Sequence, residues 1–332
     1  MANITILGGG SWGSALAMLA SANNHDITIW TNEESVCCDI NTNRLNSYYT
    51  KECIFDDNVK ASLNLNESLK GADAVIMAIP SQVFRMVLTD LKKIIPLNMP
   101  FLNAGKGLEA NSGLRETQVI EQVMGEEFAF NSVILSGPNL AMEFARKIPG
   151  ATVLASKNIK NAKRFQEILS SSIMRAYTST DVIGVECGGS LKNIMAIACG
   201  LSSGLGFGDN TKAAIQTRGL KEITRLGVLL GAKQETFYGL SGLGDMITTC
   251  SSMLSRNFRL GFMLAEGKKL EEALKELGQV AEGVPSCKAA ILLSKKHKID
   301  MPITEEIYKI LWEEKSPREA VLDLMKRGFK EE

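Results

Sequence analysis

The stretch that most constrains the fold of this chain is Gly8-Gly-Gly-Ser-Trp-Gly13, which has the spacing G-x-G-x-x-G. It follows an apolar run at residues 4–7 with the composition of a buried strand. In a dinucleotide-binding turn the first glycine makes the tight bend, the second lets the backbone approach a pyrophosphate, and the third lets helix and strand pack closely. Gly8, Gly10 and Gly13 hold those three positions.

The residues after this turn complete a βαβ unit. We expect a helix from about residue 14 to 20 and a second strand at residues 26–30. Free N–H groups at a helix start, together with the helix macrodipole, favour a bound anion. The unit therefore predicts dinucleotide binding, and a purely structural glycine turn is the alternative.

Composition and charge exclude several classes of protein. The 332 residues are 45% hydrophobic, enough for a large core divided between two domains. A formal net charge of zero gives no electrostatic footprint for nucleic acid. No lysine or arginine precedes Arg44, and no long uninterrupted apolar run occurs, so we expect neither export nor membrane insertion. The seven scattered cysteines indicate reduced thiols in a cytoplasmic protein, without a metal site.

Further strands in the first half of the chain end in small, polar turns. An apolar run at residues 74–79 is typical of a strand buried on both faces, and shorter strands are expected at 101–103 and 133–135. Glycine-bearing turns follow at 104–107 and 136–139. Because ligands bind at the carboxyl ends of parallel strands, we expect both turns to lie beside the first one.

The remaining pattern separates an α/β half from a helical half. Ser81 is expected to cap a helix after the third strand. The alternation continues with a strand at 151–155, a helix at 161–169 and a strand at 175–178, after which apolar residues recur at helical spacing. The predicted fold is a doubly wound Rossmann-type domain at residues 1–183 followed by an all-helical domain at 184–332. Its helices are expected at 186–201, 211–230, 255–265, 271–277, 286–295 and 304–312.

Several kinds of redox chemistry are disfavoured by the residues available. The two histidines, His25 and His297, stand in positions unsuited to an active-site acid, and no tyrosine has a lysine four positions later. The cysteine spacing does not fit a zinc alcohol dehydrogenase. If the protein is a redox enzyme, a lysine or a carboxylate is the expected proton carrier.

Three stretches of the second half combine small and polar residues. Glu186-Cys-Gly-Gly-Ser-Leu-Lys-Asn193 opens its first helix, and Gly239-Leu-Ser-Gly-Leu-Gly-Asp245 has the composition of a glycine-rich turn. Ser255-Arg-Asn257 precedes another helix, where hydroxyl, guanidinium and amide groups together with the helix N-terminus suit a phosphate. Ordinary helix capping is the alternative explanation for the serine and asparagine.

Together these motifs resemble those of the bacterial NAD(P)-dependent glycerol-3-phosphate dehydrogenase family almost from end to end. The resemblance implies reversible reduction of dihydroxyacetone phosphate to sn-glycerol 3-phosphate, which supplies glycerophospholipid synthesis. It also implies an NAD or NADP cofactor, a small phosphorylated substrate and a cytoplasmic homodimer. The matching motifs are Gly8 to Gly13, Lys106-Gly107, Gly137-Pro138 with Ala141, Glu186 to Asn193, Gly242 to Asp245, Ser255 to Asn257, and Gln279 to Gly283.

The resemblance also assigns roles to individual residues. Lys192 is implied as the proton carrier in a catalytic set of Lys106, Lys192, Asn193 and Asp245. Cofactor contacts are implied for Gly8, Gly10, Ser11, Trp12, Gly13, Lys106, Ala141, Arg256, Val280 and Glu282. Substrate contacts are implied for Lys106, Gly137, Asn139, Lys192, Asp245, Thr249, Ser255, Arg256 and Asn257.

The chain departs from the family pattern in two places. Asn139 and Leu140 replace the usual serine or threonine and phenylalanine after Gly-Pro. Thr31-Asn-Glu-Glu34 stands where the family has an arginine near the adenosine ribose. The missing arginine weakens the expected preference for NADP, so we expect appreciable use of NAD(H), unless another basic residue such as Arg44 supplies that contact.

Two other functions are compatible with parts of this pattern. A two-domain 3-hydroxyacid dehydrogenase would use a helix lysine and asparagine in the same way, but would act on a carboxylate. A non-catalytic nicotinamide-binding protein would keep Gly8 to Gly13 without needing Lys106, Lys192 and Asp245 together.

Overall fold

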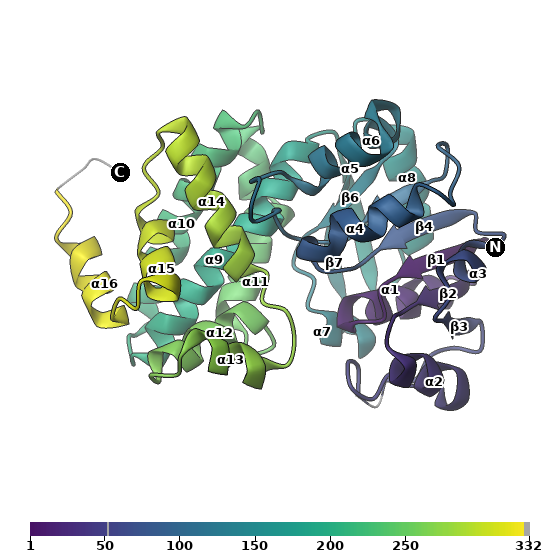
Figure 1. The fold of residues 1–332 in the computed structure, drawn as a ribbon, viewed down its shortest axis with the longest axis horizontal. Helices are drawn as coiled ribbons and strands as arrows, with labels where there is room; N and C mark the ends of the chain where they lie inside the picture. The colour runs from purple at the N-terminus through teal and green to yellow at the C-terminus, as the bar shows by residue number, and fades with distance from the viewer. Residues whose placement is uncertain (52, 329–332) are drawn as a thin grey trace.

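An eight-stranded sheet organises the first half of the chain in the computed structural model, which describes residues 1–51 and 53–328 (Figure 1). The strand order is β3-β2-β1-β4-β5-β6-β7-β8; β7 pairs antiparallel with β6 and parallel with β8, so β7 and β8 run opposite to the other strands. The strands are β1 (Asn3–Leu7), β2 (Asp26–Trp30), β3 (Val59–Ser62), β4 (Ala74–Met77), β5 (Phe101–Asn103), β6 (Val133–Ser136), β7 (Gly150–Ala155) and β8 (Met174–Ser179).

Helices cover both faces of this sheet because its central strands are apolar on both sides. Ile4 and Ile6 of β1 belong to one buried cluster with Leu16, whereas Val75 and Met77 of β4 belong to another. This arrangement confirms the doubly wound prediction. The helices are α1 (Ser11–Ala22), α2 (Glu34–Asn43), α3 (Leu65–Leu69), α4 (Ser81–Leu91), α5 (Glu116–Met124), α6 (Glu126–Asn131), α7 (Ala141–Ala145) and α8 (Ile159–Leu169).

Two local expectations for this half are wrong. Helix α1 begins at Ser11 rather than near residue 14, because Gly10 is its N-cap. Ser81 is the first residue of α4 rather than its cap, which is Pro80. The Ser81 hydroxyl donates to the Glu282 carboxylate instead, and a charged acceptor makes the stronger hydrogen bond.

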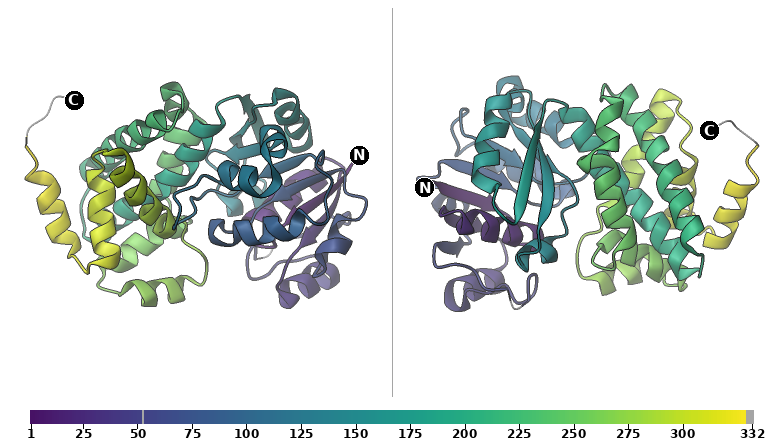
Figure 2. Two further views of the ribbon diagram at one scale, coloured as in Figure 1. Left: turned by 45° about the horizontal axis from the view of Figure 1, so that its top comes forward. Right: turned by 180° about the vertical axis from the view of Figure 1, so that it is seen from behind.

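The second half is entirely helical and lies beside the sheet, with α16 at the end farthest from it (Figures 1 and 2). Helix α9 runs through its centre and packs against α10, α11, α12 and α14. The elements are α9 (Val182–Gly204), α10 (Asp209–Leu229), η1 (Gln234–Tyr238), η2 (Leu240–Gly244), α11 (Asp245–Ser251), α12 (Arg256–Ala265), α13 (Leu270–Leu277), α14 (Gly283–His297), α15 (Pro302–Trp312) and α16 (Pro317–Met325).

Helix α9 is long and apolar enough to cross a membrane, but 94% of its apolar window is buried inside the protein. It is the core helix of this half. A Cβ atom on Gly200 would lie 2.0 Å from the carbonyl oxygen of Phe258 in α12. The glycine thus lets the two helix backbones approach directly.

The stretch Gly239 to Asp245, expected as a turn, is helical from Leu240 onward. Leu240–Gly244 forms a single π-helical segment that leads directly into α11. Gly242 allows this, since a Cβ there would lie 2.1 Å from the carbonyl oxygen of Phe237. Of the predicted helical domain, residues 329–332 lie outside the described residues.

Candidate active site

The turn between β1 and α1 has the geometry expected for a pyrophosphate site. Gly8 has a φ of +121°, and a Cβ there would lie 2.4 Å from the Ala78 carbonyl oxygen. A Cβ on Gly13 would lie 1.9 Å from the Gly8 carbonyl oxygen. Gly10, by contrast, has nothing within 4 Å of that position, and no side chain caps α1. The turn therefore leaves an open approach to the helix N-terminus, as a dinucleotide needs.

Side chains after this turn connect it with the loop that follows β5. Ser11 opens α1, and the Trp12 indole Nε1 donates to the Ala104 carbonyl oxygen over 3.2 Å. The Trp12 ring lies 6.0 Å from that of Phe144 in α7, the helix that Ala141 begins. The predicted cofactor contacts Ser11 and Trp12 thus lie on a helix that packs against α7, the helix that Ala141 begins.

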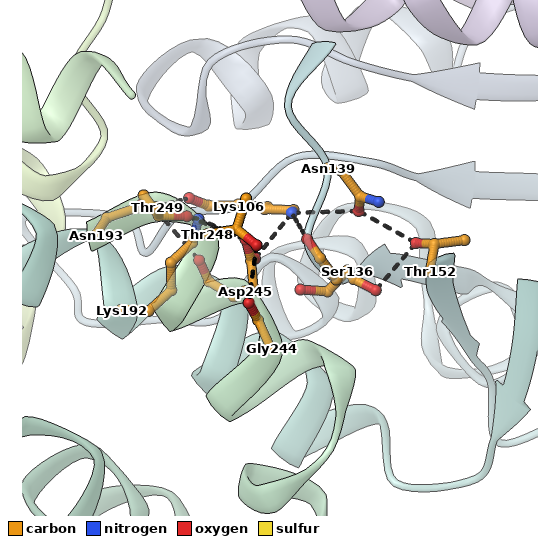
Figure 3. Close-up of polar contacts among 12 residues, drawn as sticks. Lys106, Ser136, Asn139, Thr152, Lys192, Asn193, Gly244, Asp245, Thr248 and Thr249 are labelled. Carbon is orange, nitrogen blue, oxygen red and sulfur yellow. Dashed lines mark hydrogen bonds and ion pairs between the residues drawn. The ribbon is translucent and has the colours of Figure 1, made fainter. Parts of the chain in front are cut away.

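Two lysines share one buried carboxylate where the two halves of the chain meet (Figure 3). The Lys192 ammonium in α9 lies 2.9 Å from Oδ1 of Asp245, and the Lys106 ammonium lies 2.9 Å from Oδ2. The Thr249 hydroxyl, one turn after Asp245 in α11, contacts both Lys192 and Asp245. Lys192 is only 5% exposed and Asp245 only 1%, so this cluster is withdrawn from bulk water.

The charges of this cluster do not cancel. Two ammonium groups and one carboxylate leave one excess positive charge, which suits an anionic ligand. Burial lowers the pKa of Lys106 to about 8, with the charge of Lys192 acting in the same direction and Asp245 opposing it. Lys106 therefore loses its proton at a lower pH than an ordinary lysine does.

The loop after β6 holds Lys106 from the other side. Lys106 Nζ donates to the Gly137 carbonyl oxygen over 2.7 Å and to Asn139 Oδ1 over 3.4 Å. The Asn139 oxygen also accepts from the Thr152 hydroxyl in β7, and its amide nitrogen donates to the Ala151 carbonyl. Asn139, the residue that departs from the family pattern, thus contacts Lys106 and fixes it to β7.

A relay of amides joins this cluster to α12 and α14. The Asn193 side chain donates to the Lys106 carbonyl oxygen over 3.2 Å and accepts from Asn257 over 2.9 Å. Asn257 in turn accepts from the Gly283 backbone N–H over 2.8 Å. The predicted residues Asn193 and Asn257 are therefore brought together with Lys106.

The remaining predicted residues surround the start of α12. Ser255 is the N-cap, and its hydroxyl oxygen accepts from the Phe258 N–H, as the capping alternative required. Within residues 1–51 and 53–328 the Arg256 guanidinium makes no hydrogen bond or ion pair; burial lowers its pKa, while the charge of Glu282 opposes that shift. Glu282 accepts from the Ser81 N–H, and Val280 is 41% exposed.

Two buried carboxylates near the site were given no role from the sequence, although Glu186 opens one of the matching motifs. Glu186 accepts from the Thr117 backbone N–H and pairs with Arg115, which links α9 to α5. Glu116 accepts from the Asn103 amide, whose oxygen accepts from the Gly105 N–H just before Lys106. Burial raises the pKa of Glu116 well above its usual value. For Glu116 the sequence signal was the position of its partner Asn103 at the end of a buried strand.

Comparisons with known proteins agree with one another over the whole chain. Residues 3–162 match a family described as NAD-dependent glycerol-3-phosphate dehydrogenase N-terminus, and residues 181–322 match the corresponding C-terminus. A glycerol-3-phosphate dehydrogenase (NAD(P)+) from Thermoanaerobacter sp. (strain X514) is 46% identical over 99% of this chain and 98% of its own length. One from Listeria innocua is 45% identical over 98% and 97%. The crystal structure of glycerol-3-phosphate dehydrogenase from Coxiella burnetii is 37% identical, covers 98% of this chain and 99% of its own, and superposes with a TM-score of 0.93.

Proposed function

The chain belongs to the NAD-dependent glycerol-3-phosphate dehydrogenase family, and from that premise we propose a role for each residue of its site. The protein is an NAD(P)-dependent oxidoreductase that interconverts dihydroxyacetone phosphate and sn-glycerol 3-phosphate. The observation that carries the assignment of roles is the buried Lys106–Asp245–Lys192 cluster beside the dinucleotide turn.

Lys192 is the proton carrier of the reaction. The bound nicotinamide supplies the hydride for reduction and accepts it in oxidation. As the C2 carbonyl of dihydroxyacetone phosphate is reduced, Lys192 Nζ donates a proton to its oxygen, and in the reverse direction the neutral amine takes that proton from the C2 hydroxyl. Asp245 and Thr249 hold the ammonium in place, since both hydrogen-bond to it.

Lys106 and Arg256 bind the anionic part of the substrate. Lys106 is held by Asp245, Gly137 and Asn139 and adds the excess positive charge of the site. Among the residues that the structure describes, the Arg256 guanidinium makes no hydrogen bond or ion pair, so it can take two phosphate oxygens at once. Asn257 uses one N–H for Asn193, so its second N–H is available to the same phosphate. Ser255 contributes by starting α12 at this point.

The residues of the dinucleotide site are Gly8, Gly10 and Gly13 with Ser11, Trp12 and Ala141. The open face at Gly10 and the uncapped start of α1 support this part of the proposal. Val280 and Glu282 complete it from the helical domain, where Glu282 also contacts the start of α4.

The wider setting is also proposed. We divide the chain into domains at residues 1–183 and 184–332; helix α9 begins at Val182, so the boundary falls in its first turn. We further propose a cytoplasmic homodimer whose product enters glycerophospholipid synthesis. The location, the homodimer and the metabolic role rest on the family membership.

A substrate panel tests the function. NADH and NADPH should be oxidised rapidly with dihydroxyacetone phosphate. With unphosphorylated dihydroxyacetone, kcat/KM should be lower by at least about a hundredfold, which corresponds to nearly 3 kcal/mol of transition-state stabilisation. A set of 2-oxo and 3-oxo carboxylates covers the alternative activity. Faster turnover of any carboxylate than of dihydroxyacetone phosphate would contradict the proposal.

A further inference from the structure

The end of β2 lies against the dinucleotide turn. The Gly8 N–H donates to the carbonyl oxygen of Trp30, the last residue of β2, over 2.9 Å. A Cβ on Gly9 would lie 2.9 Å from the Cβ of Thr31, so the turn packs closely against the Thr31 side chain. Glu33 follows two residues later as the N-cap of α2. In a doubly wound fold this is where the adenosine ribose of a dinucleotide lies.

The Glu33 carboxylate is held by a tyrosine from a separate loop. The Tyr49 hydroxyl donates to Glu33 Oε1 over 2.9 Å. Burial and this contact raise the pKa of Tyr49 to about 12, so the hydroxyl remains a donor at any working pH. One carboxylate oxygen is thereby committed, and no donor in the described part of the chain occupies Oε2, which can accept from a ligand.

The loop that carries Tyr49 is fastened at both sides of the site. The buried Asn46 side chain donates to the Gly9 carbonyl oxygen over 2.8 Å and to the Ser14 hydroxyl over 2.9 Å. The Tyr48 hydroxyl donates to the carbonyl oxygen of Gly278 in the helical domain over 3.1 Å. Tyr49 is therefore positioned before any ligand binds, and so is the carboxylate that it contacts.

We propose that Glu33, positioned by Tyr49, makes this enzyme select NAD(H) over NADP(H). Glu33 Oε2 accepts a hydrogen bond from the ribose 2′-hydroxyl of NAD(H), whereas the 2′-phosphate of NADP(H) would place a dianion beside a fixed carboxylate. The inference rests on the proposed dinucleotide site. It deepens that proposal by naming the residue that discriminates between the two cofactors and the residue that orients it.

Two basic residues that could reverse this preference, Arg44 and Arg256, have other partners or assignments. No lysine or arginine occurs from Thr31 to Asn43. Arg44, the basic residue that the sequence offered as a substitute, forms an ion pair with Asp57. Arg256 acts on Tyr49 through its charge, but its guanidinium is assigned above to the substrate phosphate.

The test compares the two cofactors by binding and by catalysis. Dissociation constants of NADH and NADPH are measured without substrate by titrating their fluorescence, and kcat/KM is measured with dihydroxyacetone phosphate. For the wild type, both the dissociation constants and kcat/KM should favour NADH over NADPH by at least about tenfold. Glu33→Gln should reduce that ratio by about tenfold to a hundredfold, the range for losing a hydrogen bond to a charged group.

Two further variants separate orientation from charge. Tyr49→Phe should weaken NADH binding and raise its KM by about threefold to tenfold, while kcat stays within about twofold, because only a positioning hydrogen bond is lost. Glu34→Gln is the matched control, since this neighbouring carboxylate is exposed and should leave the cofactor ratio unchanged.

Three outcomes would overturn the inference: a wild type that favours NADPH, a cofactor ratio unaffected by Glu33→Gln, or a Glu34→Gln variant that changes the ratio as much as Glu33→Gln does. The binding ratio is measured without substrate, so a failure of the proposed substrate assignment leaves this test intact.

Discussion

At the scale of single residues, the site depends on how one carboxylate divides its two oxygens. Asp245 gives one oxygen to Lys192 and the other to Lys106, which sets two ammonium groups side by side in a buried place. Neither ammonium is fully neutralised by a shared partner. Lys192 is then placed to transfer a proton and Lys106 to bind an anion, so substitutions at the two lysines should have different consequences.

Removing the proton carrier should stop the chemistry and spare the cofactor. Lys192→Met is expected to lower kcat by at least about a hundredfold, the usual contribution of a general acid. NADH affinity should stay within about threefold, which corresponds to less than 1 kcal/mol. Steady-state kinetics and fluorescence titration measure the two effects. Lys296→Met, at an exposed lysine of α14, is the control. A Lys192→Met variant that kept a tenth of its kcat would refute the assignment.

Arg256 should matter through the phosphate. Arg256→Lys keeps the positive charge but loses the planar fork that binds two oxygens. We expect kcat/KM for dihydroxyacetone phosphate to fall by about 1.5 to 3 kcal/mol, the range for a hydrogen bond to a charged group. Because remote binding can lower the barrier, kcat should fall along with affinity. If unphosphorylated dihydroxyacetone lost the same factor, Arg256 would not be recognising the phosphate.

Lys106 should impose an alkaline limit on substrate capture. Its pKa is lowered to about 8, so the ammonium is charged below that pH and becomes neutral above it. Since kcat/KM reports ionisations of the free enzyme, kcat/KM for dihydroxyacetone phosphate should fall as the pH rises through about 8. In Lys106→Arg the guanidinium stays charged, and the limit should move upward by at least about one pH unit. If the pH profile of Lys106→Arg showed the same alkaline limit as the wild type, that limit would belong to another group.

At the scale of elements, the glycines of the first turn should separate stability from binding. Gly13→Ala places a methyl 1.9 Å from the Gly8 carbonyl oxygen, so we expect a loss of about 1–3 kcal/mol in the free energy of unfolding, as for other overpacked sites. Gly10→Ala meets open space in extended backbone and should cost less than about 1 kcal/mol. Its methyl group would instead obstruct the pyrophosphate and weaken NADH binding.

Urea unfolding and NADH titration of both glycine variants check these expectations. Gly10→Ala should bind NADH at least about tenfold more weakly while unfolding near the wild-type midpoint. Wild-type NADH affinity in Gly10→Ala would show that the open space at Gly10 has no special part in binding.

The elements predicted well from the sequence were those defined by their own residues. β1, β2 and the long helices α9 and α10 follow apolar patterns that lie within one segment. The expectation for Ser81 was wrong because its partner, Glu282, lies far along the chain. The Tyr49 contact with Glu33 and the Asn103 contact with Glu116 were missed for the same reason: such pairs depend on tertiary packing, which a local pattern does not contain.

At the scale of the whole molecule, the two domains are joined by buried polar contacts as well as by packing. Lys106 pairs with Asp245, and Glu186 of α9 accepts from Thr117 of α5. Ser81 donates to Glu282 across the same boundary. Separating the domains would leave buried charges without partners, which is strongly destabilising. Each domain therefore needs the other to pair the charged groups that lie buried between them.

This dependence predicts a single cooperative unfolding transition, which the tryptophans allow us to test. Trp12 and Trp30 lie in the first domain, and Trp312 is the tryptophan of the second. In Trp312→Phe the fluorescence reports the first domain, and in the double variant Trp12→Phe/Trp30→Phe it reports the second. At one fixed protein concentration, the urea midpoint from fluorescence should coincide in each variant with that from far-ultraviolet circular dichroism, which follows all the helices. A fluorescence midpoint that preceded the circular dichroism midpoint in one variant and followed it in the other would show that the domains unfold separately. In that case the contacts across the boundary would be too weak to couple them.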